Sequence, residues 1–214
     1  MVLPMSHSLP TMSHSLPKSL KLTYFNIKAR GEPIRLALSI LGLPFEDSRL
    51  KDHQEFKKLQ SEGALPMNQV PLLTVDETVD IAQSTAILRF IGKFSTHQSP
   101  RLYPEDPYKA ALVDQLISMV QDVEMSLKPS GVEQDAVKRL AMRIELSATT
   151  LPTQFGYIDK FLASKKTGDF LLGTFHDVSL LTSMIYRTAS KHWRFVLVSN
   201  EYFLFCGRIR WNSN

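Results

Sequence analysis

The sequence predicts a fold of two parts, an α/β layer followed by an all-α half, and three observations lead to this prediction. Strand-like and helical segments alternate between residues 20 and 94, prolines concentrate between His97 and Pro107, and helical periodicity dominates after them. The chain has 214 residues, of which 43% are apolar. It can therefore bury a core, as one large domain or two small ones.

The first part of the α/β layer contains a strand, a helix and a second strand. Residues Lys21–Phe25 and Phe45–Leu50 are strand-like. Between them, Pro33–Leu41 carries apolar residues at helical spacing and begins with a proline, which a helix tolerates in its first turn. Gly42 can end that helix, because glycine readily adopts the left-handed conformation common after helices.

The second part of the layer contains two strands and a helix after a polar stretch. His53–Glu62 is polar, and we interpret it as irregular or weakly helical. Val70–Val75 is rich in β-forming residues, residues 76–77 form a turn where glycine would be easier, and Ile81 belongs to a short return strand. Ser84–Phe94 has helical spacing. This order of segments predicts a thioredoxin-like α/β layer.

The helical half follows the proline-rich stretch. Asp106 can cap a helix with Pro107 at its first position, and we expect this helix to extend to about Met125. A second helical stretch contains Pro152 as a kink or a restart, and a third helix is expected after Thr174. The apolar positions of the second stretch are Val137, Leu140, Ala141, Ile144, Leu151, Phe155, Ile158 and Leu162.

These segments divide the chain into five regions. We expect a flexible extension (1–19), an α/β thioredoxin-like N-terminal domain (20–96), a linker (97–105), an all-α helical C-terminal domain (106–187) and an atypical tail (188–214). The extension contains a short tandem repeat and lacks the basic start and long apolar core of a secretory signal. The tail fits no helical period, and we interpret it as a spliced, shifted or wrongly assigned end of the reading frame.

The composition argues against several classes of protein. No apolar run reaches the ~20 residues of a membrane-spanning helix. The single Cys206 excludes an internal disulfide and a thiolate metal cluster, and the histidines lack the spacing of zinc ligands. The formal charge of +4 resides in residues 186–214, so no basic stripe runs through the fold. We expect a cytoplasmic protein with no metal and with no membrane or nucleic-acid partner.

Tyr24 is the first candidate for chemistry. It stands near the end of the first strand, with Arg30 six residues on and a helix following. A phenol held in this way can act as a weak acid beside a thiol, although a tyrosine at a strand end more often packs in a core or at an edge. The stretch Leu22–Pro33 resembles the opening of the sigma-class-like soluble glutathione transferases, in which this tyrosine activates the sulfur of glutathione. Arg30 is expected to give structural and electrostatic support, or simply to form a salt bridge.

The second candidate feature is the segment from Gln69 to Pro71. Proline cannot donate a backbone hydrogen bond, and a cis bond before it would turn the backbone of Val70 outward. The resemblance implies such a cis bond, with Val70 pairing its N–H and C=O with the cysteinyl part of glutathione. The alternative is a proline that starts an edge strand in trans.

The third candidate feature is Gln83–Ile87, which reads Gln-Ser-Thr-Ala-Ile. Ser84 is placed to cap a helix, and a helix start suits a carboxylate because its N–H groups are free and its partial charge is positive. A plain N-cap is the alternative. This segment is similar to the family's Gln-Ser-x-Ala-Ile motif, which binds the γ-glutamyl carboxylate, and its distance from Pro71 also matches.

The first helix of the all-α half carries a fourth candidate. Asp114, Ser118, Gln121 and Asp122 share one helical face, which by default is a solvated face. In sigma-class-like relatives an aspartate matching Asp122 reaches across a dimer to the ammonium of the γ-glutamyl group. The resemblance therefore implies a homodimer in which the partner subunit completes the site.

The chain also departs from the family. Phe56 replaces a tryptophan that contacts the glycyl end of glutathione, and Lys57, Lys58 or Gln60 remain alternatives for binding the glycyl carboxylate. The family's Thr-x-x-Asp capping motif has a counterpart at residues 174–177, and the resemblance ends near residue 187.

The resemblance implies a glutathione transferase that conjugates the glutathione thiolate to electrophilic hydrophobic substrates, a reaction of detoxification. Glutathione is then the co-substrate, and the partners are a hydrophobic electrophile and a second copy of the chain. Tyr24 is the implied catalytic residue, and the implied glutathione-binding residues are Phe25, Arg30, Asn68, Gln69, Val70, Pro71, Gln83, Ser84 and Asp122. Two alternatives stay open: a glutathione-dependent isomerase of the prostaglandin type, and a non-catalytic binding or structural protein of the same fold.

Overall fold

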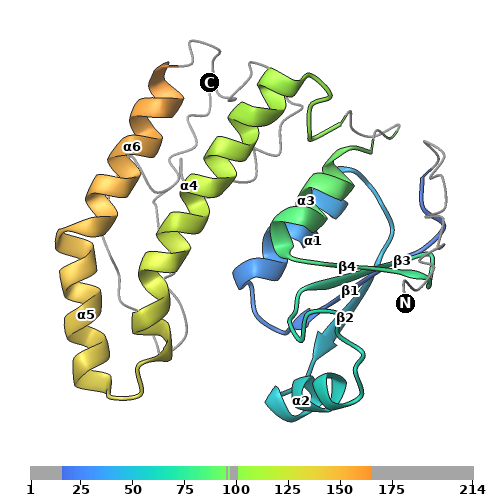
Figure 1. The fold of residues 1–214 in the computed structure, drawn as a ribbon, viewed down its shortest axis with the longest axis horizontal. Coiled ribbons are helices and arrows are strands. Elements are labelled where there is room, and N and C mark those ends of the chain that lie inside the picture. The colour runs from blue at the N-terminus through green and yellow to red at the C-terminus, as the bar shows by residue number, and fades with distance from the viewer. Residues whose placement is uncertain (1–15, 95, 97–100, 165–214) are drawn as a thin grey trace, which may run out of the picture.

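A computed structural model of the chain describes residues 16–94, 96 and 101–164. These residues form an α/β half built on one sheet and a helical half that lies beside it (Figure 1). The predicted fold class, an α/β thioredoxin-like part followed by an all-α part, is confirmed. The repeat in the extension, the third helix expected after Thr174 and the tail lie outside the described residues, and the domain boundaries stay predictions.

The sheet has four strands in the order β2-β1-β3-β4. The strands are β1 (Leu20–Phe25), β2 (Glu46–Leu50), β3 (Leu72–Val75) and β4 (Val79–Ala82). β1 pairs in parallel with β2 and antiparallel with β3, and β3 pairs antiparallel with β4. The parallel pair needs a crossover, and the helix between its strands supplies it.

Three helices and one short turn complete the α/β half. They are η1 (Ala29–Gly31), a single 3₁₀ turn, and the helices α1 (Glu32–Ile40), α2 (His53–Ser61) and α3 (Ser84–Gly92). α1 and α3 contact each other, and α3 also contacts β3 and β4. α2 lies at the end of β2, apart from the other two helices (Figure 1).

The polar stretch after β2 is a regular helix. The Asp52 side chain accepts hydrogen bonds from the N–H groups of Gln54 and Glu55, at 2.8 and 2.9 Å. This cap satisfies two of the N–H groups that a helix start leaves without partners. The weakly helical alternative for this stretch is therefore right, and the irregular one is wrong.

The turn between β3 and β4 has a left-handed backbone conformation, which is unfavourable for its two non-glycine residues. Asp76 and Glu77 have φ of 50° and 58°, in the left-handed region that favours glycine. The Asp76 carboxylate accepts hydrogen bonds from the backbone N–H groups of Lys18 and Ser19, at 2.6 and 2.9 Å. These bonds offset part of the cost and fasten the turn to the start of β1.

The helical half begins with the long helix α4 (Pro107–Val132). The Asp106 carboxylate caps it by accepting the Lys109 N–H at 2.9 Å, as predicted. The predicted end near Met125 is wrong. The helix continues because its inward face still buries side chains such as Ser130, whose hydroxyl donates to the backbone carbonyl three residues earlier.

Two further helices, α5 (Ala136–Ala148) and α6 (Thr150–Ser164), follow one another along one side of α4 (Figure 1). The break between them is Thr149, at φ −124° and ψ −77°. Pro152 lies in the first turn of α6, where its missing N–H costs no hydrogen bond. Of the two alternatives for this proline, the restart is right.

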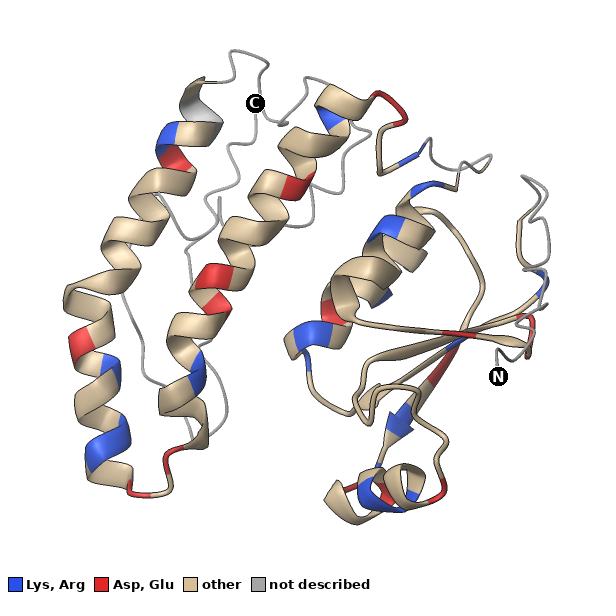
Figure 2. Cartoon of the chain, viewed as in Figure 1, with Lys and Arg blue, Asp and Glu red and all other residues tan. Residues whose placement is uncertain are grey.

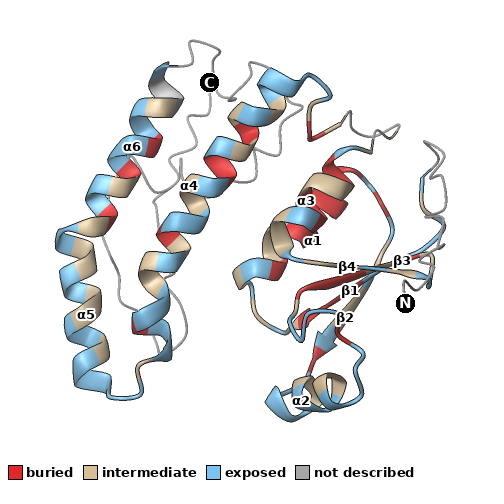
Figure 3. Ribbon diagram, viewed as in Figure 1, coloured by how far each residue is buried: buried red, intermediate tan, exposed pale blue. Residues whose placement is uncertain are grey.

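One cluster of buried apolar side chains spans both halves (Figure 3). It includes Leu22, Ile34, Leu38, Leu73, Ile87 and Ile91 from the α/β half and Val113, Leu116, Leu151, Phe155 and Ile158 from the helical half. Leu102 and Tyr103 of the predicted linker are buried in the same cluster. Each fully buried Leu or Ile stabilises the fold by about 1.5–3 kcal/mol. The linker is therefore part of the packing between the halves.

Candidate active site

The strand register brings the three candidate segments of the α/β half to one end of the sheet. Thr23 pairs with Leu72, and Leu72 pairs with Ala82 on its other side. The next positions in each strand are Tyr24, Pro71 and Gln83. Since neighbouring strands lie about 4.8 Å apart, these positions are neighbours across the sheet. Segments separated along the chain thus meet at a single edge.

Tyr24 is packed against the turn that follows β1. Its side chain is only 6% exposed, and its phenol oxygen accepts a hydrogen bond from the Arg30 N–H at 3.3 Å. This bond uses a lone pair of the oxygen and not its proton. The turn can approach the ring because Gly31 has no side chain: a Cβ there would lie 2.4 Å from Cδ1 of the ring.

The turn itself has an unusual backbone. Ala29 has φ of 29°, which a residue with a Cβ rarely adopts. Such conformations persist where the surroundings hold them, often at functional sites. Here the conformation belongs to the turn whose next N–H is directed at the Tyr24 oxygen.

Arg35 holds the chain between β1 and η1, and the sequence analysis missed it. Its guanidinium donates to the carbonyls of Phe25 and Ile27 and to the Asp47 carboxylate, and it lies 5.9 Å from the centroid of the Tyr24 ring. The side chain is 6% exposed. A signal was available, because an arginine within the apolar stripe of a helix must find partners when it is buried.

The peptide bond between Val70 and Pro71 is cis, as the resemblance implied. Within the described part of the chain, no hydrogen bond uses the backbone N–H or C=O of Val70. The Gln60 amide, one alternative for the glycyl carboxylate, donates instead to the Asn68 carbonyl at 2.8 Å. Asn68 has φ of 51°, in the left-handed region that asparagine tolerates.

The start of α3 differs from the prediction by one residue. Gln83 is the N-cap, and Ser84 is the first helical residue, with no capping bond from a side chain. Gln83 has φ of 71°, and its amide donates to Oε1 of Gln69 at 3.3 Å. The side chains of Gln69 and Gln83 therefore link the residues before β3 to the end of β4. The first N–H groups of α3 keep the anion-binding character of a helix start.

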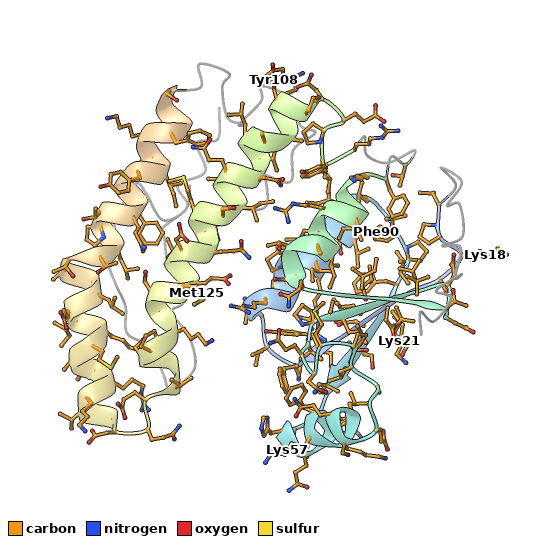
Figure 4. All side chains as sticks on the ribbon, in the orientation of Figure 1. Lys18, Lys21, Lys57, Phe90, Tyr108 and Met125 are labelled. Carbon is orange, nitrogen blue, oxygen red and sulfur yellow. The ribbon has the colours of Figure 1, made fainter. Side chains whose placement is uncertain are left out.

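Aromatic side chains extend the site toward α2. The Phe25 and Phe56 ring centroids lie 5.3 Å apart, and the His53 ring lies 5.5 Å from Phe56. Lys57, in the middle of α2, is exposed on the side away from α1 and α3 (Figure 4). Nζ of Lys58 lies 3.8 Å from the carboxylate of Glu62, the residue that follows α2. Lys57, Lys58 and Gln60 are the alternatives for binding a glycyl carboxylate.

A charged pair joins the two halves next to Tyr24. Nε of Arg30 lies 3.2 Å from Oε2 of Glu124 on α4. In Figure 2 the basic segment before α1 faces acidic segments of α4. Burial raises the pKa of Glu124, and Arg30 counteracts part of that rise. The salt bridge considered for Arg30 is thus present and is interdomain, whereas Glu124 was not foreseen.

The polar face of α4 is divided. Asp114 accepts a hydrogen bond from Nε of Arg89 on α3 at 2.7 Å, so this residue is partly exposed and paired. Ser118, Gln121 and Asp122 are exposed, as the solvated-face interpretation expects. Asp122 lies outside the group of residues that meets at the sheet edge.

The described residues contain no group of three or more His, Cys, Asp or Glu side chains that could hold a metal ion. None of the described helices combines the length and the apolar character that crossing a bilayer requires.

Comparison with known proteins gives consistent results. Residues 20–93 match the family description "Glutathione S-transferase, N-terminal domain". Glutathione S-transferase 1 of Ascaris suum is 32% identical over 158 residues, which cover 72% of this chain and 71% of that protein. The chain belongs to the glutathione S-transferase family. This membership confirms the predicted function and enzyme class, a glutathione S-transferase.

Two further relatives of this glutathione transferase carry a narrower name. The hematopoietic prostaglandin D synthase of Gallus gallus is 32% identical over 146 residues, covering 68% of each chain. The solved structure of the prostaglandin synthase D of Nilaparvata lugens has a TM-score of 0.67 at 28% identity, covering 80% of this chain and 82% of that one.

Proposed function

We propose that Tyr24 is the catalytic residue of this glutathione transferase and that it stabilises the thiolate of bound glutathione for attack on a hydrophobic electrophile. The observation that supports this role most strongly is the register of the sheet, in which the position of Tyr24 neighbours that of Pro71, and Pro71 in turn neighbours Gln83. The phenol oxygen already accepts the Arg30 N–H, which favours a developing negative charge on the phenol and strengthens it as a donor.

The free energy needed to lower the pKa of the glutathione thiol is similar to that of one hydrogen bond. A free thiol has a pKa of about 8.5, so little of it is ionised at neutral pH. Lowering that value by about two units requires roughly 2.7 kcal/mol of preferential stabilisation of the anion. A hydroxyl that donates to a thiolate forms a charge-assisted bond, which is worth about 1.5–3 kcal/mol.

The remaining proposed residues bind the peptide part of glutathione. The backbone of Val70, beside Pro71, pairs with the cysteinyl unit, and the start of α3 at Ser84 binds the γ-glutamyl carboxylate. In the described part of the chain, the backbone of Val70 makes no hydrogen bond and no side chain caps α3, which fits such a ligand. We propose that Phe25, Arg30, Asn68, Gln69 and Gln83 complete the glutathione site at this edge of the sheet.

We further propose a sigma-class-like enzyme that acts as a homodimer in the cytoplasm in detoxification. Asp122 then binds the glutathione ammonium from the partner subunit, and its exposure on α4 is compatible with that role. The predicted absence of a resident metal, a membrane partner and a nucleic-acid partner belongs to this proposal.

A second candidate is a glutathione-dependent isomerase that acts on an endoperoxide. The similarity to two prostaglandin D synthases favours it. It would use the same thiolate, so product analysis after incubation with prostaglandin H2 separates it from conjugation.

The first test is the Tyr24→Phe variant, assayed with glutathione and 1-chloro-2,4-dinitrobenzene. We expect kcat/KM to fall on the order of tenfold to a hundredfold and its pH profile to shift upward, since the thiol loses its donor. Calorimetry of glutathione binding shows whether the ligand still binds.

Tyr157→Phe is the matched control, because Tyr157 is 61% exposed on α6 and far along the chain from the site. It should leave turnover unchanged. Near-normal turnover by Tyr24→Phe would eliminate the proposed role of Tyr24. Glutathione binding without turnover in the wild-type protein would instead favour the non-catalytic alternative.

A further inference from the structure

Glu124 and Arg30 form the closest charged contact between α4 and the residues around Tyr24. The backbone N–H of Arg30 bonds the Tyr24 oxygen, while its side chain reaches across to the carboxylate of Glu124. The pair is therefore the charged group of α4 that is linked, through Arg30, to the Tyr24 oxygen. The net charge of that region depends on whether the guanidinium is free or paired.

The pair is poorly suited to be a structural brace. The two side chains are 48% and 42% exposed, so solvent screens their attraction. A closer and less exposed contact, between Arg89 and Asp114 at 2.7 Å, already joins α3 to α4. The principal effect of Glu124 is then local, on the charge presented by Arg30.

We propose that Glu124 is a specificity-determining residue, which neutralises Arg30 and thereby selects uncharged electrophiles over electrophiles that carry a carboxylate. A free guanidinium beside the reacting centre would attract a substrate carboxylate, because the fork of arginine matches that group. With Glu124 in place, a substrate carboxylate must displace it or lie beside a like charge. This inference rests on the proposed function, because it concerns the second substrate of the same reaction.

The inference bears on the two candidate functions. An aromatic electrophile such as 1-chloro-2,4-dinitrobenzene is uncharged, whereas prostaglandin H2 carries a carboxylate. The paired state of Arg30 therefore favours conjugation of neutral compounds.

A matched pair of substrates tests the inference: ethacrynic acid and its methyl ester, each with saturating glutathione. In both, sulfur bonds to the terminal methylene carbon of the enone and the thiol proton goes to the adjacent carbon, so the reaction is the same and the two substrates differ in charge and by one methyl group. We expect Glu124→Gln to raise kcat/KM for the acid by about fivefold and to leave the ester nearly unchanged, a size typical of a partly exposed charge.

Two controls separate this effect from others. Glu145→Gln removes the same charge from an exposed position on α5, and it should leave kcat/KM for both substrates unchanged. In an Arg30→Gln background, Glu124→Gln should give a much smaller gain for the acid, since the cation is gone. Thermal unfolding of each variant verifies the fold, and Glu124→Met replaces Glu124→Gln if that variant does not fold.

An unchanged ratio of acid to ester turnover in Glu124→Gln would overturn the inference while the proposed function stands. Equal gains for the acid and the ester would overturn it as well. Absence of ester turnover by the wild-type protein would overturn the proposed function, and the inference with it.

Discussion

At the scale of single residues, the position of Tyr24 depends on residue 31 being a glycine, which has no side chain. A Cβ at Gly31 would lie 2.4 Å from Cδ1 and 2.8 Å from Cγ of the Tyr24 ring. Neither atom is at the end of a flexible side chain, so the ring or the turn would have to move. Because the same turn carries the Arg30 N–H, such a movement would also disturb the phenol oxygen.

Gly31→Ala is therefore expected to lower both stability and activity. The overpacking should cost about 1–3 kcal/mol of unfolding free energy, measured by denaturant titration. Gly156→Ala on α6 is the matched control, because nothing lies within 4 Å of its Cβ position. It should raise stability by about 0.5–1 kcal/mol, since glycine in a helix interior is unfavourable. A neutral effect of Gly31→Ala on both properties would show that the turn is loosely packed.

Arg30 and Arg35 differ in how far their roles could be predicted from the sequence. Tyr24 and Arg30 belong to a local motif, so their spacing along the chain indicated their association. Arg35 stands on the buried side of α1, and its partners come from the turn after β1 and from β2. Its role therefore depends on how the helix is rotated against the sheet.

At the scale of elements, a polar cluster joins α3, the linker and α4. Arg89 donates to Asp114 at 2.7 Å, and Tyr103 lies beside both. Burial lowers the pKa of Arg89, but Asp114 and Tyr103 together outweigh it, so the pKa is raised. Burial and Asp114 both raise the pKa of Tyr103, and Arg89 opposes them.

The raised pKa of Tyr103 predicts a pH dependence of stability. Above the ordinary value of 10.0, the unfolded chain loses the phenol proton while the folded protein retains it. The folded state then binds more protons, so stability falls as the pH rises through this window. Tyr103→Phe should show a shallower fall there in thermal unfolding. An identical slope in both proteins would exclude this contribution.

The motifs of the α/β half were foreseen to within a residue, because each is a short stretch with its own backbone requirement. The cis bond before Pro71 and the start of α3 near Ser84 are examples. The end of α4 was placed too early, near Met125. Pro129 and Gly131 are local signals for a later end, and burial of Ser130 on one helix face accompanies the extension to Val132.

At the scale of the whole molecule, one apolar cluster extends through both halves and the linker between them. Unfolding either half alone would expose apolar surface on the other. We therefore expect the full chain to unfold in a single cooperative transition.

Asp114→Ala tests how the halves depend on each other. Loss of the bond to Arg89 should cost about 1 kcal/mol, because the pair is partly exposed, and should lower the midpoint without splitting the transition. Circular dichroism and differential scanning calorimetry should report the same midpoint. Glu145→Ala, on an exposed part of α5, is the control and should change stability by less than about 0.5 kcal/mol. Two separate transitions would argue that the halves unfold independently.

The order of strands and helices, the tyrosine motif and the proline before β3 follow from the sequence alone, because backbone preferences and residue periodicity act over a few neighbouring positions. The contacts of Arg30 with Glu124 and of Arg89 with Asp114 do not. These partners are 94 and 25 residues apart, and they meet only because α4 packs along the α/β half. Side chains so distant along the chain are brought together by burial of a shared core, which no local spacing encodes.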